Sequence, residues 1–216
     1  MAVDIAEITK QLNSISPHSR KEILVLLNEL SEAKQRIDAQ NDFLTFVRKM
    51  WPAFIEGSHH KVMADAFNRI ADGSLKRLIV NMPPRHTKSE FASNLFPAWY
   101  LGRYPDKKVI QTAHTAELAV GFGRKVRNLV GSHGYKKIFT DVSLSSDSKA
   151  AGRWDTNKRG EYFAIGVGGA VTGKGADILI VDDPHSEQEA ALKDPSVYDR
   201  TYEWYTSGPR QRLQPG

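Results

Sequence analysis

The stretch MPPRHTKSE, residues 82–90, decides how this chain is expected to fold, because it joins an apolar run to the start of a helix. The apolar run Leu78-Ile79-Val80 precedes it and predicts a strand. Thr87 stands where a capping residue would begin a helix at Lys88. A turn that leads from a strand into a helix aims backbone N–H groups at one point, which is an arrangement that binds phosphate groups.

The same stretch supplies the side chains that a phosphate-binding loop uses. In such a loop a Lys reaches the terminal phosphates and a hydroxyl holds Mg²⁺, and here Lys88 and Ser89 provide both groups. The usual pattern G-x-x-x-x-G-K-[ST] has glycines where this chain has Met82 and Thr87. On this stretch alone, a plain strand-to-helix connection through a Pro-Pro turn is therefore an open alternative.

A second segment carries two acids at the end of an apolar run. Residues 177–184, DILIVDDP, predict a buried parallel strand with polar groups at its carboxyl end. In phosphoryl-transfer enzymes such a carboxylate holds Mg²⁺, and a second one beside it can orient the attacking water. We assign the first role to Asp182 and the second to Asp183. Alone they would be an acidic turn, but together with Lys88 and Ser89 they predict a nucleoside triphosphatase that uses Mg²⁺ and ATP.

The chain resembles the large terminase subunit of tailed bacteriophages. Four segments carry the resemblance, in order and spacing: residues 80–90, the sequence FPAW at 96–99, the sequence GGAVTGKGAD at 168–177, and VDDP at 181–184. The likeness runs from about Trp51 to the C-terminus.

The resemblance implies a DNA-packaging motor that drives double-stranded DNA into a procapsid. It implies that the C-terminal nuclease domain, of RNase H-like fold, is absent from this chain. The implied partners are double-stranded DNA, the portal protein and the small terminase subunit. The implied assembly is a homo-oligomeric ring on the procapsid, with a monomer in isolation. We expect no membrane association, and the implied location is the cytoplasm of the infected bacterial host.

The expected nucleotide-binding residues form one loop and one histidine outside it: Pro84, Arg85, His86, Thr87, Lys88, Ser89 and His60. By resemblance His60 contacts the adenine, with His59 as the fallback. Ser89 and Asp182 are the expected Mg²⁺ ligands, and the expected catalytic residues are Asp183, Arg85 and Lys88. Arg85 would neutralise charge on the γ-phosphate, either within its own subunit or across a ring interface. The alternative for Arg85 is a salt bridge that fixes the loop.

The expected fold is a P-loop NTPase three-layer α/β sandwich with a mostly parallel sheet, preceded by a small helical N-terminal segment. We place the helical segment at residues 1–50 and the ATPase domain at residues 51–216. We expect a strand at 109–114, a helix at 116–130, and a strand or hairpin at 161–167. The Ser-rich residues 144–157 read as an exposed connection.

Two helical patterns precede the ATPase domain, one from Ile5 to Ile15 and one from Ile23 to Ile37. They predict either a hairpin packed on the core or a docking surface for another subunit.

Composition narrows the class of protein. Of 216 residues, 40% are hydrophobic and 25% charged, as in ordinary globular domains, and there is no cysteine for a disulfide or a thiolate metal site. No apolar run approaches the ~20 residues of a membrane span. A net charge of +5 favours a polyanionic partner, although a solvated basic surface explains it equally. The cluster Arg124, Lys125 and Arg127 has the same two explanations.

Two other functions stay open at this level. One is a superfamily 2-like helicase or translocase, although Asp182-Asp183-Pro184-His185 matches the helicase box only loosely and no second motor domain is visible. The other is a nucleotide-binding scaffold module that does not hydrolyse ATP.

Overall fold

The computed structural model describes residues 16–191 and 194–214. The chain divides into two units, Met1–Asp38 and Ala39–Gly216. The described part of the first unit belongs to helix α2 (Pro17–Asn41), which confirms the second helical pattern. The first pattern, from Ile5 to Ile15, lies outside the described residues. The exposed apolar side chains of α2 are Leu24, Val25, Leu26, Leu27, Leu30 and Ile37. The choice between a hairpin and a docking surface stays a prediction.

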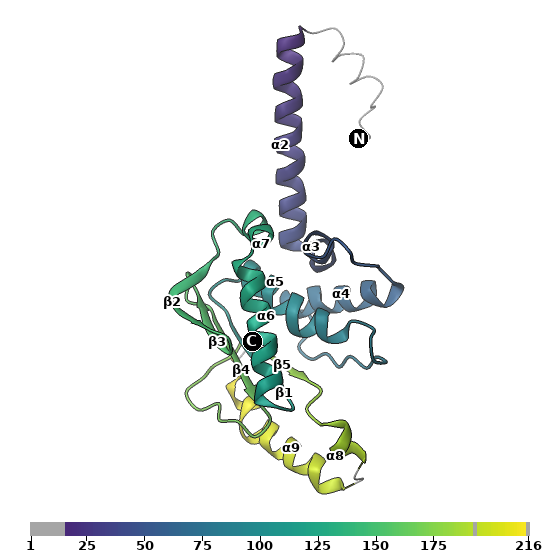
Figure 1. Cartoon of the computed structure of the whole chain (residues 1–216), viewed down its shortest axis with the longest axis vertical. Helices are drawn as coiled ribbons and strands as arrows, with labels where there is room; N and C mark the ends of the chain where they lie inside the picture. Colours follow the sequence, from purple (N-terminus) through teal and green to yellow (C-terminus); the bar gives the residue numbers. More distant parts are fainter. Residues whose placement is uncertain (1–15, 192–193, 215–216) are drawn as a thin grey trace. The chain divides into compact units, whose positions relative to one another are not determined.

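The second unit contains a mixed sheet of five strands in the order β2-β3-β4-β1-β5 (Figure 1). β1 pairs in parallel with β4 on one side and with β5 on the other. β2 pairs antiparallel with β3, and β3 antiparallel with β4. The strands are β1 (Lys108–Ala113), β2 (Leu144–Ala150), β3 (Arg153–Thr156), β4 (Glu161–Gly166) and β5 (Ile178–Asp182).

The prediction of a mostly parallel three-layer P-loop sandwich is wrong, because half of the described strand pairings are antiparallel. The connections 151–152 and 157–160 are too short for a crossover, so β2, β3 and β4 must alternate in direction. Residues 144–157, which we expected to be an exposed connection, form β2 and β3. The run Leu78-Ile79-Val80, expected as a strand, forms none, and Ile79 is 84% exposed.

Besides α2, the parallel strand expected within residues 177–184 is confirmed as β5, although only its last residue is buried. Three further predicted elements are confirmed. β1 and β4 occupy the expected positions, and helix α6 (Ala116–Gly131) follows β1 directly. Thr115 caps α6, since its side chain accepts a hydrogen bond from the Leu118 N–H. α6 packs on β1 and β4 (Figure 1).

The remaining helical elements of the described chain are short. They are α3 (Phe43–Met50), α4 (Ser58–Ala71), the π-helix η1 (Glu90–Leu95), α5 (Phe96–Arg103), α7 (His133–Ile138), α8 (Glu187–Ala191), α9 (Pro195–Ser207) and the 3₁₀ helix η2 (Pro209–Arg212). In the described residues no helix is long and apolar enough to cross a membrane.

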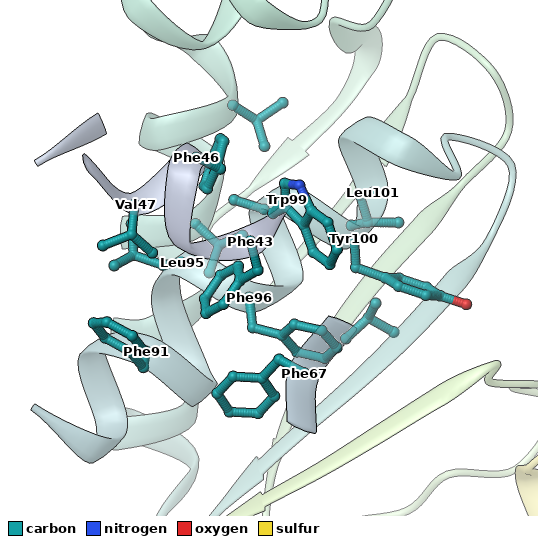
Figure 2. Packing of buried hydrophobic residues seen from close by; sticks show 14 of the residues in the cluster. Phe43, Phe46, Val47, Phe67, Phe91, Leu95, Phe96, Trp99, Tyr100 and Leu101 are labelled. Carbon is teal, nitrogen blue, oxygen red and sulfur yellow. The ribbon is translucent and has the colours of Figure 1, made fainter. Parts of the chain in front are cut away.

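An aromatic cluster joins α3, α4, η1 and α5. Figure 2 shows Phe43 among the rings of these helices. Its ring meets those of Phe67, Phe91 and Phe96 edge to face, with centroids 5.3, 5.6 and 5.9 Å away. Such contacts add to the stabilisation from burying the rings. Trp99 is fully buried, and its Nε1 donates to the Ala39 carbonyl at 3.1 Å. The cluster therefore packs against one side of the helix that begins at Lys88 and holds it in place.

Candidate active site

The loop before η1 holds two residues in an unusual backbone conformation. Arg85 has a φ of 65° and Thr87 a φ of 63°, which is the left-handed region. For residues other than glycine this region costs about 1–2 kcal/mol each. Thr87 stands at the position where the phosphate-loop pattern has glycine, which adopts this conformation freely. The loop thus keeps the shape expected for glycine although a threonine occupies the position, and such strain tends to cluster at functional sites.

The helix after this loop presents its first turn toward the site. The Phe91 N–H donates to the Thr87 carbonyl at 3.0 Å, so helical hydrogen bonding begins at Thr87. The first N–H groups of a helix lack partners within it and can bind an anion. Lys88 and Ser89 lie in this first turn, and both are half-buried.

Asp182 is a buried carboxylate at the end of β5. The parallel register with β1 places it opposite Ala113, and 5% of it is exposed. Ser93 Oγ donates to Asp182 Oδ2 at 2.7 Å, and Gln111 Nε2 donates to Ser93 Oγ at 3.2 Å. Lys88 Nζ lies 3.7 Å from Asp182 Oδ1. A buried charge needs such partners, so these contacts fix where the carboxylate lies.

Asp183, the next residue, lies in solvent but contacts the same lysine. Its φ is 42° and its side chain is 65% exposed. Lys88 Nζ donates to Asp183 Oδ1 at 2.5 Å. Two adjacent acids therefore meet the ammonium group of a lysine that lies more than ninety positions earlier in the sequence.

The other predicted loop residues are more exposed. Pro84, Arg85 and His86 all face solvent. The His86 ring donates from Nδ1 to the Pro84 carbonyl at 2.9 Å. The structure therefore places these three residues beside the site without an ion pair to its acids.

His60 lies under the loop and not at its open side. Its Nδ1 accepts from the Gly57 N–H at 2.8 Å, and its Nε2 lies 2.7 Å from Thr87 Oγ1. The residue is 4% exposed, with its ring stacked on Phe91 at a centroid distance of 4.9 Å. A hydrogen bond from either ring nitrogen to an adenine would require one of these contacts to break. The ring of the fallback residue, His59, lies beside it at a centroid distance of 3.8 Å, tilted by 42°.

Sequence reasoning missed Ser93 and Gln111, which hold Asp182. Both are fully buried. A signal existed for each: Ser93 follows Ser89 by four residues on the same helical run, and Gln111 interrupts the apolar strand of Val109 and Ile110. Polar residues at core positions of this kind point to a buried partner.

A groove with a volume of ≈840 Å³ includes three of the site residues in its walls, whereas Ser89 and the loop residues 84–87 do not line it. β5 forms one wall, and the non-strand residues 76–81 and helix α9 contribute others. Lys88, Asp182 and Asp183 line it, together with Tyr198 and Tyr202 of α9. The volume lies in the range of small-molecule sites.

The residues at this site fit Mg²⁺ bound together with a nucleotide. Among the described residues no group of three or more His, Asp or Glu side chains could hold a metal by itself. Mg²⁺ usually binds through one or two carboxylates plus substrate phosphates and water. The buried carboxylate of Asp182 matches the protein part of that donor set, and Ser89 in the first helical turn supplies the hydroxyl of the phosphate-loop pattern.

The basic cluster on α6 is partly engaged within the protein. Lys125 Nζ lies 3.8 Å from Glu90 Oε2, and Arg127 donates to the Lys149 carbonyl at 2.8 Å. Contact between this cluster and DNA stays a prediction.

Comparisons with models of known protein families and with characterised proteins find no match for the chain. The functional argument therefore rests on the geometry of the site and on the motifs in the sequence.

Proposed function

We propose that this chain is an ATP hydrolase that uses Mg²⁺, and that it is the motor domain of a terminase large subunit that packages double-stranded DNA. The observation that carries the hydrolase proposal is the contact of Lys88 with both Asp182 and Asp183 at the start of a helix. The loop before that helix has the left-handed residues that phosphate-binding turns require. The packaging role, the portal and small-subunit partners and the host cytoplasm follow from the sequence motifs alone.

Lys88 and the loop amides would bind the β- and γ-phosphates. A polyphosphate competes with Asp183 for the ammonium of Lys88, because both are anions within reach of the same group. Ser89 and Asp182 would hold Mg²⁺, which would neutralise negative charge on the phosphates. Ser93 keeps Asp182 oriented toward the helix start.

Asp183 would position the attacking water. Its carboxylate is exposed, so it can accept a hydrogen bond from water once the phosphates take Lys88. Its positive φ turns it away from the direction of β5. Arg85, exposed in the loop, would face the γ-phosphate or a neighbouring subunit.

The proposal is tested by phosphate release from Mg·ATP under steady-state conditions. Lys88→Ala should lower turnover at least about 100-fold, in line with the loss of one preorganised charge contact. Lys136→Ala, which removes an exposed lysine of α7, is the matched control and should keep full activity. Equal turnover in the wild type and Lys88→Ala would refute the proposed phosphate loop, and no turnover above background in the wild type would refute the hydrolase. Nucleotide binding without turnover would indicate the scaffold alternative instead, and strand displacement would indicate the helicase.

If a ring neighbour completes the site, specific activity should rise with protein concentration. Specific activity that stays constant over a hundredfold dilution would show that one subunit contains the whole site.

A further inference from the structure

Thr87 needs a partner that holds it in the left-handed conformation. The residue carries a β-branched side chain, for which a φ of 63° is unfavourable. The first helical hydrogen bond, from Phe91 to the Thr87 carbonyl, depends on where this backbone lies. Whatever fixes Thr87 therefore also fixes the loop and the first turn after it.

The hydrogen bonds around His60 determine which ring nitrogen carries the proton. The Gly57 N–H can only donate, so His60 Nδ1 accepts at 2.8 Å. A neutral ring with an accepting Nδ1 has its proton on Nε2, which then donates to Thr87 Oγ1 at 2.7 Å. The Thr87 hydroxyl donates in turn to the His86 carbonyl at 2.6 Å. The three bonds form a directed chain from α4 into the loop.

The surroundings of His60 keep the ring in place and neutral. Phe91 stacks on one face and the ring of Phe54 meets it edge to face, at 4.9 and 4.7 Å between centroids. The titratable groups that act on it are Glu56, His59 and His86. Burial lowers the pKa of His60 most, His59 and His86 lower it further, and Glu56 opposes them.

We infer that His60 is a positioning residue that holds Thr87 in the left-handed conformation and so shapes the phosphate loop. It acts through Thr87 and not by contact with the base of a nucleotide. The effect on turnover rests on the proposed ATP hydrolysis, whereas the effect on the loop does not.

A double-mutant cycle with Thr87→Gly tests the inference. Glycine adopts the left-handed conformation without strain, so a loop with Gly at position 87 no longer needs the histidine. His60→Asn keeps an acceptor for the Gly57 N–H and loses the donor to Thr87. We expect His60→Asn to lower kcat/KM about tenfold in the wild-type background, as for the loss of a contact worth about 1.4 kcal/mol, and less than twofold in Thr87→Gly. Equal losses in both backgrounds would overturn the inference, because His60 would then act elsewhere.

A conservative replacement adds a second check. The amide of His60→Gln reaches as far as Nε2 and can donate to Thr87 Oγ1. We expect this variant to recover most of the activity that His60→Asn loses. Recovery no better than with His60→Asn would contradict the role of the Nε2–H bond.

A measurement without nucleotide separates this inference from the proposed function. Trypsin cleavage after the exposed Arg85 reports loop opening, and cleavage after the exposed Arg77 serves as an internal control. We expect His60→Asn to speed cleavage after Arg85 severalfold while cleavage after Arg77 is unchanged. If the wild type hydrolyses no ATP, the proposed function fails but this test still applies. Unchanged cleavage after Arg85, or an equal increase at both sites, would overturn the positioning role.

Discussion

The two sides of the helical run that begins at Lys88 are built differently. On one side lies the aromatic cluster, in which Phe43 and Phe91 are fully buried. On the other lies β5, where Val181 is 40% exposed. η1 belongs to both, since Phe91 packs in the cluster while Ser93 donates to Asp182. This comparison shows that packing stabilises the helix on one side, whereas the charged residues of the candidate site lie on the other. Mutations can therefore separate effects on stability from effects on the site.

The largest expected effect comes from a substitution in the aromatic cluster. Trp99→Ala should lower the free energy of unfolding by about 3–5 kcal/mol, because it empties a fully buried site and removes the bond to the Ala39 carbonyl. Urea unfolding measures this, with the half-buried Trp51→Ala as the matched control. A loss below about 1 kcal/mol would mean that the cluster does not support the fold as described.

The next largest effect comes from substitutions of the two acids on the β5 side of the helix. For Asp183 the substitution should leave the free energy of unfolding almost unchanged. Asp183→Asn should keep or tighten binding of Mg·ATP and lower turnover about 100-fold, since it relieves repulsion with the γ-phosphate and loses the water-orienting charge. Asp182→Asn should weaken binding and turnover together. Calorimetry with a non-hydrolysable analogue, beside turnover, compares the two. Near-normal turnover in Asp183→Asn would mean that another carboxylate orients the attacking water.

A smaller effect is the pH dependence that His60, which lies between the two sides, gives to the free energy of unfolding. The pKa of His60 is lowered from 6.5, so the unfolded chain binds the proton more readily than the folded one. Its contribution to stability is thus fully present above pH 6.5 and is lost as the pH falls from there toward the lowered pKa, by at most about 1.4 kcal/mol per pH unit. Urea unfolding between pH 7.5 and 5.5 should show a smaller loss in His60→Gln. Identical pH dependence in the wild type and His60→Gln would exclude His60 as its source.

The smallest effect lies beyond β5. Ile79→Ser should change the free energy of unfolding by no more than about 0.5 kcal/mol, because the side chain is 84% exposed. Leu101→Ser, at a fully buried position, should be far more destabilising and serves as the contrast. A large loss at Ile79 would show that residues 76–81 pack more tightly in solution.

Sequence periodicity predicted the elements in which the pattern of buried residues matches the secondary structure. β1 is buried along almost its whole length, and α6 has an apolar pattern that matches one buried face, so both positions could be predicted from the sequence. β2 could not be predicted this way, because the sequence LSSDSKA is mostly exposed and its pairing with β3 is made by the backbone. The apolar run at 78–80 failed for the opposite reason, since a strand needs a bonded neighbour as well as apolar side chains.

The charged residues of the candidate site could be proposed from the sequence, but the residues that hydrogen-bond to the site could not. Lys88 on the one hand and Asp182 and Asp183 on the other stand in two short motifs that can be recognised locally, and the structure brings the three residues together. The bond from Ser93 to Asp182 spans 89 positions, and that from His60 to Thr87 spans 27. Such contacts depend on how elements pack, which local patterns do not encode.

The place of β5 at the end of the strand order bears on how its amides exchange with solvent. Successive N–H groups of a strand point to opposite sides, so every second amide of a terminal strand lacks a bonded strand neighbour. β1, with a parallel partner on either side, should exchange its amide hydrogens slowly along its whole length. β5 should instead show fast and slow exchange at alternate residues up to Asp182. The strand that carries the acids should therefore take up deuterium earlier than β1, the strand with which it pairs.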